Sequence, residues 1–174
     1  MENEQASTKK IIIQYGVLFG IASVLLGVVL YVTNAYKDPH WSYSILSFLL
    51  IISVISLGIK AYKTANNGFL TLSDALKTGI GIALVGGIIS VIWAFILTTV
   101  IEPEYMQQVL EIQKEKMIED NPNFSQEQID QSMAIAEKFT SPYITIAFSM
   151  IGSLFFGFIV SLFAGLIMQR KPED

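Results

Sequence analysis

Several residue types that build familiar active sites are absent or rare in this sequence. It contains no cysteine and a single histidine, His40. The lack of cysteine excludes disulfide bonds, thiolate metal sites and cysteine nucleophiles, and one histidine cannot form a multi-histidine metal site. Charged residues make up 15% of the chain, against about 25% in an ordinary soluble domain. The net charge of −4 argues against a basic surface that binds nucleic acid.

Hydrophobic residues, in contrast, make up 52% of the chain, and they gather in four long apolar runs. As a helix, the third run would be about 34 Å long, enough to cross the roughly 30 Å hydrocarbon core of a bilayer. Backbone polar groups in lipid must be bonded within their own segment, so runs of this length are predicted to be helices. The predicted spans are residues 11–33, 42–61, 79–101 and 143–168.

The basic residues near the ends of these runs predict the orientation of the chain in the membrane. With four spans, seven of the 11 Lys and Arg residues fall on one side, and three of the other four lie in a long loop. Because short cytoplasmic loops carry an excess of Lys and Arg, both termini are predicted to be cytoplasmic and the 102–141 loop extracytoplasmic. A group of aromatic residues would then anchor the chain at the outer interface: Tyr31, Tyr36, Trp41, Tyr43, Tyr105 and Tyr143.

The 102–141 loop is acidic, with nine Asp and Glu residues against three Lys, and it predicts a helical hairpin over residues 104–139. Its two apolar stripes have helical spacing and are separated by the breaker at residues 120–123. Ser125 and Gln128 have the spacing of a capping box at the start of the second helix. An uncovered stripe would be an exposed apolar patch, so we expect it to be buried against the bundle or a partner. The predicted packing face consists of Met106, Leu110, Met117, Ile129 and Met133.

A distinctive polar stretch precedes the third run. Residues 66–68 predict a turn, and Thr71 and Asp74 again have capping-box spacing. We interpret this stretch as a short amphipathic helix that lies at the cytoplasmic interface and turns into the third span. Leu72, Ala75 and Leu76 would face the membrane, and Asp74 and Lys77 would face water. The alternative is a ligand or gating site that uses Asp74 and Lys77. The residues of this candidate interfacial motif are Gly68, Thr71, Asp74, Lys77 and Gly79.

Residues 67–79, with the sequence NGFLTLSDALKTG, precede an apolar span that ends in Glu102 and Pro103. Together with the four-span layout and the acidic loop, this segment resembles an uncharacterised family of small four-helix bacterial membrane proteins, domain of unknown function 4199. The likeness covers nearly the whole chain. It implies an integral protein of the bacterial cytoplasmic (inner) membrane, and it brings no activity, cofactor or functional residue with it.

Small residues recur at four-residue spacing in three of the runs, and this spacing predicts close helix packing in lipid. They are Gly16 and Gly20 in the first run, Gly79, Ala83 and Gly87 in the third, and Gly157, Ser161 and Gly165 in the fourth. We favour packing within the chain. The alternative is that one of these faces pairs with a second copy or with another membrane protein.

The sequence therefore predicts an all-α, polytopic membrane protein: four transmembrane helices with an extracytoplasmic two-helix hairpin between spans three and four. No nucleophile–base pair, metal cluster or phosphate-binding glycine loop is present in the sequence, so no catalytic, cofactor or metal residue is predicted. Only a buried carboxylate pair, such as Glu102 with Glu104, would favour an enzyme. The leading hypothesis is a non-catalytic structural, accessory or interaction protein in the lipid bilayer. The alternative is an oligomeric permease for a small neutral solute, with a polar path built from Ser53, Ser56, Ser90 and Ser149.

Overall fold

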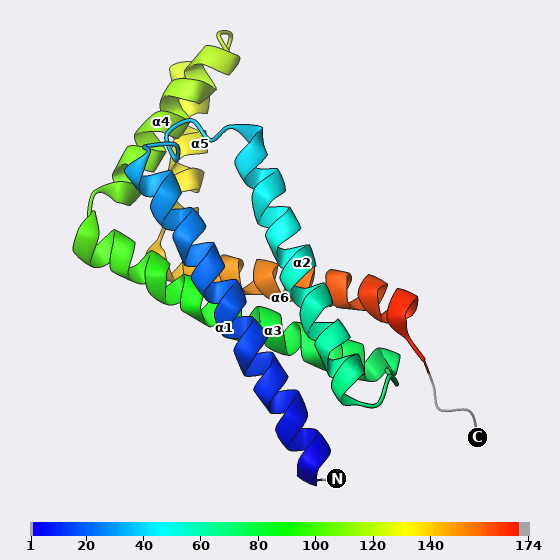
Figure 1. Ribbon diagram of the computed structural model, residues 1–174. Coiled ribbons are helices and arrows are strands. Elements are labelled where there is room, and N and C mark those ends of the chain that lie inside the picture. The colour runs from blue at the N-terminus through cyan, green and yellow to red at the C-terminus, as the bar shows by residue number, and fades with distance from the viewer. Residues whose placement is uncertain (1, 171–174) are drawn as a thin grey trace.

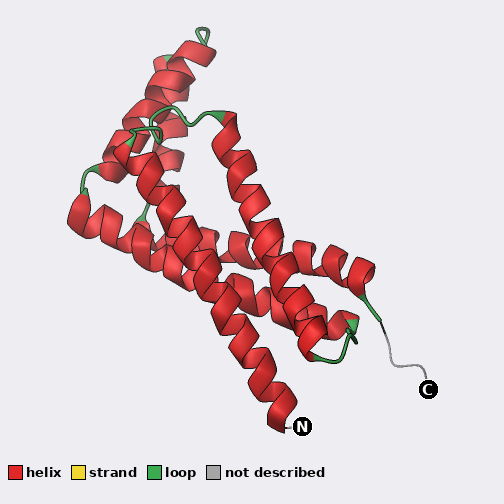
Figure 2. Ribbon diagram, in the orientation of Figure 1, coloured by secondary structure: helices red, strands yellow, loops and turns green. Residues whose placement is uncertain are grey.

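The computed structural model describes residues 2–170, which form six α-helices joined by short turns (Figures 1 and 2). A π-helical turn, Leu97–Ile101, extends the third helix, and a single bridge between Leu70 and Arg170 is the sole β pairing in this part of the chain. The prediction of an all-α fold is confirmed. The helices are α1 (Glu2–Val32), α2 (Trp41–Ala65), α3 (Leu72–Ile96), α4 (Tyr105–Asp120), α5 (Gln126–Phe139) and α6 (Pro142–Met168).

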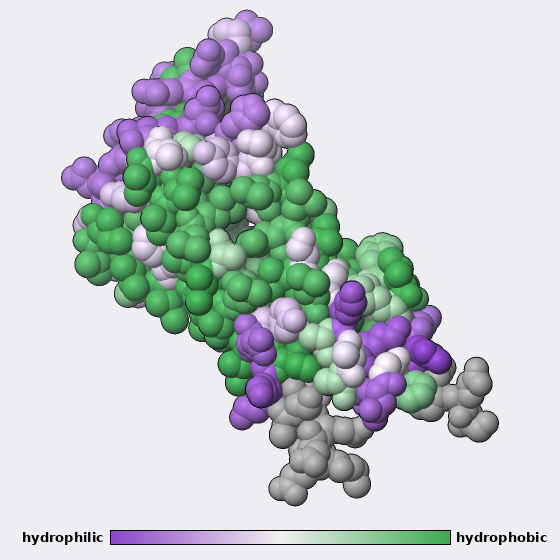
Figure 3. All heavy atoms as spheres, viewed as in Figure 1, coloured by the Kyte–Doolittle hydropathy of each residue, from purple (hydrophilic) through white to green (hydrophobic). Residues whose placement is uncertain are grey.

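Four of these helices are long and apolar enough to cross a membrane. The candidate spans are Thr8–Val32, Trp41–Ala65, Leu72–Ile101 and Tyr143–Met168. Large hydrophobic side chains lie on their outer surface, including Leu25 and Phe163, each 60% exposed. Figure 3 shows this surface as a continuous hydrophobic belt with hydrophilic residues at its two ends. A surface of this kind suits hydrocarbon rather than water, so the fold is that of a polytopic membrane protein.

The helix that forms the third span begins earlier than predicted. α3 runs without a break from Leu72 to Ile96, so the capping box and the span belong to one helix. The expectation of a separate interfacial helix was therefore wrong. Ala75 is also fully buried rather than turned toward the membrane. The reason is its place one turn before Gly79, on the small-residue face against which α6 packs.

α3 is the centre of the bundle, with α1 packed along one side and α6 along the other (Figure 1). On the α1 side, glycine lets the two backbones come close. A methyl group added at Gly16 would lie 2.5 Å from the Cβ atom of Val85, and one added at Gly20 would lie 2.6 Å from that of Ile89. No larger residue fits at either position without moving one of the helices.

On its other side α3 meets α6 along what we call the α3–α6 seam, which consists of Ala75, Gly79 and Ala83 facing Gly165, Ser161 and Gly157. A Cβ atom at Gly157 would lie 2.4 Å from that of Ala83, and one at Gly165 would lie 2.8 Å from that of Ala75. One turn further along, the Ser153 hydroxyl donates to the Ala83 carbonyl at 2.9 Å. The small residues of α3 and α6 thus pack against each other within the chain.

The best-buried side chains lie in the half of the bundle away from the hairpin. Ile55 and Ile59 near the end of α2, Leu70 in the turn, and Ile82 in α3 are all fully buried. In the other half, α1 and α2 diverge (Figure 1). The bundle is therefore closed at the end that carries the 66–71 turn and more open toward the hairpin.

Candidate functional site

The turn between α2 and α3 is fastened to the end of α6. Leu70 and Arg170 exchange two backbone hydrogen bonds, each 2.9 Å long. The Lys63 ammonium donates to the Met168 carbonyl at 2.7 Å, and the Arg170 guanidinium lies over the Phe69 ring, 5.9 Å from its centroid. We call these contacts the clasp. The clasp joins three helix ends, and sequence spacing alone gave no sign of it because its partners are about a hundred residues apart.

The five residues of the candidate interfacial motif have separate structural tasks. Gly68 has a φ of +84°, a left-handed conformation that favours glycine in the turn. Thr71 and Asp74 form the predicted capping box, in which each side chain accepts from the other residue's backbone N–H. Gly79 lies in the α3–α6 seam, and Lys77 is exposed. The structure does not bring the five together around one cavity.

Thr78, beside Gly79, has the one buried side-chain oxygen without a hydrogen-bond partner among the described residues. Its side chain is fully buried on α3. An unpaired hydroxyl at such a place costs free energy, since burial removes its hydrogen bonds to solvent. The three cavities described below, of about 540, 180 and 450 Å³, are not lined by Thr78.

The hairpin of α4 and α5 projects from the bundle (Figure 1), and its two helices contact mainly each other. Ser125 and Gln128 form the predicted capping box at the start of α5. Of the predicted packing face, Ile129 is 5% exposed, while the other residues are half-buried: Met106, Leu110, Met117 and Met133. α5 also leaves Ile135 and Phe139, one helical turn apart, 57% and 55% exposed.

A polar network that sequence reasoning missed attaches the hairpin to the bundle. Glu102 accepts hydrogen bonds from the Tyr31 hydroxyl and the Gln108 amide, both at 3.2 Å. The Tyr36 hydroxyl in turn donates to the Gln108 side-chain oxygen at 2.8 Å. The Tyr36 and Tyr105 rings lie 4.8 Å apart between centroids. Tyr31, Tyr36 and Tyr105 thus hold the hairpin base, in addition to lying near the predicted outer interface.

One ion pair extends this attachment along α4. The Lys116 ammonium lies 2.7 Å from a carboxylate oxygen of Asp38, in the connection between α1 and α2. The hydrogen bond from Lys116, and then its positive charge, hold the pKa of Asp38 below its usual value. Burial raises the pKa of the Tyr105 hydroxyl, and the neighbouring Tyr36 adds to that shift. The hairpin is therefore held at its base and along one side.

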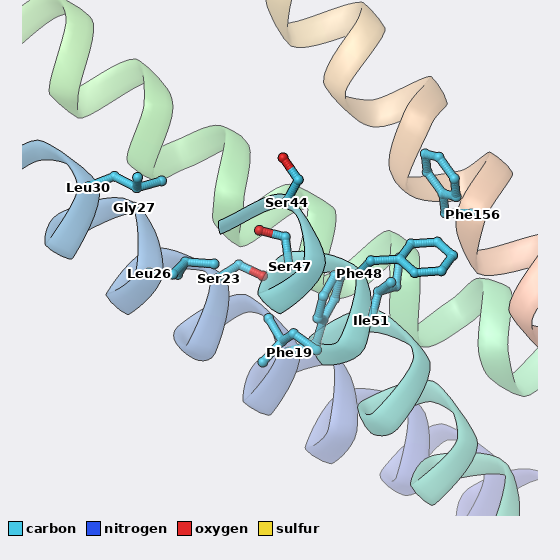
Figure 4. Close-up of a pocket in the computed structure, with 11 residues that line it drawn as sticks. Phe19, Ser23, Leu26, Gly27, Leu30, Ser44, Ser47, Phe48, Ile51 and Phe156 are labelled. Atoms are coloured by element: carbon cyan, nitrogen blue, oxygen red, sulfur yellow. The ribbon is translucent and has the colours of Figure 1, made fainter. Parts of the chain in front are cut away.

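A cavity lies between α1 and α2, where the two helices diverge. Its volume is about 540 Å³. Figure 4 shows Phe19, Phe48 and Phe156 in its wall, and the hydroxyl groups of three serines from α1 and α2 beside them. Those serines are Ser23, Ser44 and Ser47. The Ser47 hydroxyl already donates to the Tyr43 carbonyl at 2.9 Å, so the cavity is an apolar recess with few free polar groups.

A second, smaller cavity of about 180 Å³ lies between α3 and α6, and Phe19 and Ile51 line both cavities. Ser90 and Ser149, two of the four serines of the permease hypothesis, line this smaller cavity. The other two are Ser53, which is exposed on α2, and Ser56, which is half-buried there, and neither of them lines this cavity or the one between α1 and α2. The four hydroxyls are therefore divided and do not line one polar path.

A family model described as "Protein of unknown function (DUF4199)" matches residues 14–170. The chain belongs to this family. The resemblance seen in the 67–79 segment is thus confirmed, and the match runs from the first turns of the α1 span to Arg170 in the clasp. No curated protein and no solved structure matches the chain. The matched part contains the hairpin, the clasp, the last three spans and the α1 span from residue 14 onward.

The acidic residues of this DUF4199 chain were the candidates for a catalytic carboxylate pair or a metal site. Glu102 is half-buried and is bonded to a tyrosine and a glutamine, whereas Glu104 is exposed, so the two do not form a buried carboxylate pair. Within residues 2–170, no group of three His, Cys, Asp or Glu side chains is arranged to hold a metal ion. The two polar arrangements that stand out are the hairpin attachment and the clasp.

Proposed function

We propose that this protein is a non-catalytic accessory or interaction protein that presents its hairpin to another membrane protein. The observation that supports this is the pairing of a fixed base with an uncovered face. The network around Glu102 and the pair of Lys116 with Asp38 fix the hairpin. Ile135 and Phe139 stay more than half exposed, although one edge of the Phe139 ring meets the Phe148 ring of α6. Apolar side chains exposed together on a rigid element are typical of a contact surface.

The charge of the loop supports a protein partner rather than the membrane surface. Residues 102–141 carry nine acidic residues and three lysines. Anionic lipid head groups would repel such a loop, whereas a partner with basic residues around an apolar centre would complement it. The family resemblance supports a location in the bacterial cytoplasmic membrane, and the distribution of basic residues supports cytoplasmic termini with the hairpin outside.

Site-specific photo-crosslinking in native membranes tests this proposal. A photoreactive residue at Ile135 should give a discrete adduct with another membrane protein. The matched control is the same residue at Glu115, an exposed position on α4, which should give none. In a second arm, the variant carrying Ile135→Asp and Phe139→Asp should lose the partner on gentle purification. No adduct from position 135 would refute the proposal, and an adduct with a second copy alone would favour the oligomeric permease instead.

A further inference from the structure

The two ends of the molecule differ in how their charges are paired. On the hairpin side, Lys116 is paired with Asp38. At the opposite end, Lys60 on α2 has no acidic partner among the described residues. Asp74, the nearby acidic residue of α3, is engaged in its capping box with Thr71. The clasp end of the bundle therefore has positive charge that the described residues leave uncompensated.

This charge borders a concave site. A cavity of about 450 Å³ lies between the end of α2, the 66–71 turn and the end of α6. It is lined by Lys60, Lys63, Thr64, Gly68 and Met168, with no acidic residue. Lys60 and Lys63 are one helical turn apart, so their ammonium groups can reach the same side of α2. The cavity therefore has two cations at its edge and no anion.

Lys63 has donors to spare. One of its N–H groups is used by the Met168 carbonyl at 2.7 Å, which leaves two on the same nitrogen. This bond also fixes the position of the half-buried lysine beside the cavity. Lys60 is exposed and long enough to turn its ammonium toward the cavity. Thr64 adds no donor, because its hydroxyl donates to the Lys60 carbonyl at 3.0 Å.

The level of the cavity relative to the membrane indicates which class of ligand it binds. Lys60 and Lys63 lie in the last two turns of the Trp41–Ala65 candidate span, where a spanning helix leaves the hydrocarbon and meets the head groups. Basic pockets between spans at this depth suit anionic head groups, and the rest of the wall, from Gly68 and Met168, is apolar or backbone. We propose that this pocket binds a phosphate group, supplied by an anionic phospholipid or by a soluble phosphate ion.

Binding there would also act on the clasp. The phosphate oxygens would accept from Lys63 while this residue holds the end of α6. The two backbone bonds between Leu70 and Arg170 lie in the same junction. A ligand that binds the folded junction and not the unfolded chain stabilises the fold by mass action. Binding is therefore expected to raise the temperature at which the protein unfolds.

The experiment uses the full-length protein in neutral detergent, with phosphatidylglycerol, phosphatidylcholine or inorganic phosphate as the added probe. Native mass spectrometry measures bound lipid, and thermal unfolding measures stabilisation. Lys60→Gln leaves the clasp intact, since Lys60 takes no part in it. The matched control is Lys9→Gln, which removes the same charge from an exposed position on α1 outside the pocket.

We expect Lys60→Gln to weaken binding of phosphatidylglycerol about tenfold, the effect of losing one charge-assisted hydrogen bond, and Lys9→Gln to leave it unchanged. Stabilisation by phosphatidylglycerol alone identifies a lipid site. Equal stabilisation by inorganic phosphate, again lost in Lys60→Gln, identifies a soluble ligand. Equal binding by wild type and Lys60→Gln, or equal losses in both variants, overturns the proposal. Because the hairpin residues are untouched, this outcome is separable from the crosslinking result.

Discussion

Two helix pairs in this protein, α3 with α6 and α4 with α5, are held together in opposite ways. The α3–α6 seam uses Gly, Ala and Ser, and at Ala75 and Ala83 it leaves no exposed side chain. The hairpin uses large side chains that are half-buried, and Ile129 is the single buried one in its two helices. In lipid, burying a leucine gains little, because the surroundings are equally apolar, and close backbone approach is what stabilises a pair. In water, large apolar side chains supply the stabilisation.

The largest effect is expected from breaking the close approach in the seam. In Gly79→Ala, the new Cβ atom would lie 1.7 Å from the Ser161 hydroxyl oxygen and 2.8 Å from its Cβ atom, so the helices must move apart. Overpacking of this kind costs about 1–3 kcal/mol or more. Thermal unfolding in detergent should show a clear loss of stability.

Two further variants test whether the contact itself is the cause. Gly152→Ala, on the same α6 but with no atom within 4 Å of the added Cβ, should leave the unfolding temperature unchanged or higher. Adding Ser161→Gly to Gly79→Ala removes the opposing side chain and should restore part of the lost stability. If the double variant is as unstable as Gly79→Ala alone, the tight contact between these two residues is not what limits the seam.

The two capping boxes allow a direct comparison of the bundle and the hairpin, because each region has a helix that begins with the same motif. Thr71 caps α3 in the bundle, and Ser125 caps α5 in the hairpin. Thr71→Ala and Ser125→Ala should each cost about 1 kcal/mol of helix stability. The cost in α3 should lower the global unfolding temperature, whereas that in α5 should appear only as faster hydrogen exchange in the hairpin. A global loss of equal size from Ser125→Ala would show that the hairpin and bundle unfold as one unit.

What the sequence predicted and what it missed follow from the range of the interactions. The spans, the hairpin and both capping boxes depend on residues close together in the chain, where hydropathy and helical spacing are informative. The bonds from Tyr31 to Glu102 and from Lys63 to Met168 join residues 71 and 105 positions apart. Such contacts depend on how the helices cross, and the crossing geometry cannot be predicted from the spacing of residues in a single sequence. Ala75 was misplaced for the same reason, since its burial depends on α6.

The smallest effect concerns the ion pair that holds the side of the hairpin. Its pKa shift means that Asp38 binds a proton less readily in the folded protein than in the unfolded chain, owing first to the hydrogen bond from Lys116. The ion pair therefore contributes its full stabilisation above the pKa that Asp38 has in the unfolded chain, about 4. This stabilisation is lost as the pH falls through the lower pKa that Asp38 has in the folded protein. Both side chains are well exposed, 47% for Lys116 and 91% for Asp38, so the loss should be slight and should shrink further at high salt.

Hydrogen exchange of α4 at pH values between about 5 and 3 measures this loss. Protection should fall slightly in the wild type across this range, whereas Asp38→Asn, which cannot titrate, should start lower and change less. Lys116→Gln should match Asp38→Asn, because each variant removes one half of the same pair. If all three proteins lose protection in parallel, the pH dependence of the hairpin arises from its other carboxylates, and Glu102 at the base, which accepts two hydrogen bonds, would be the first to examine.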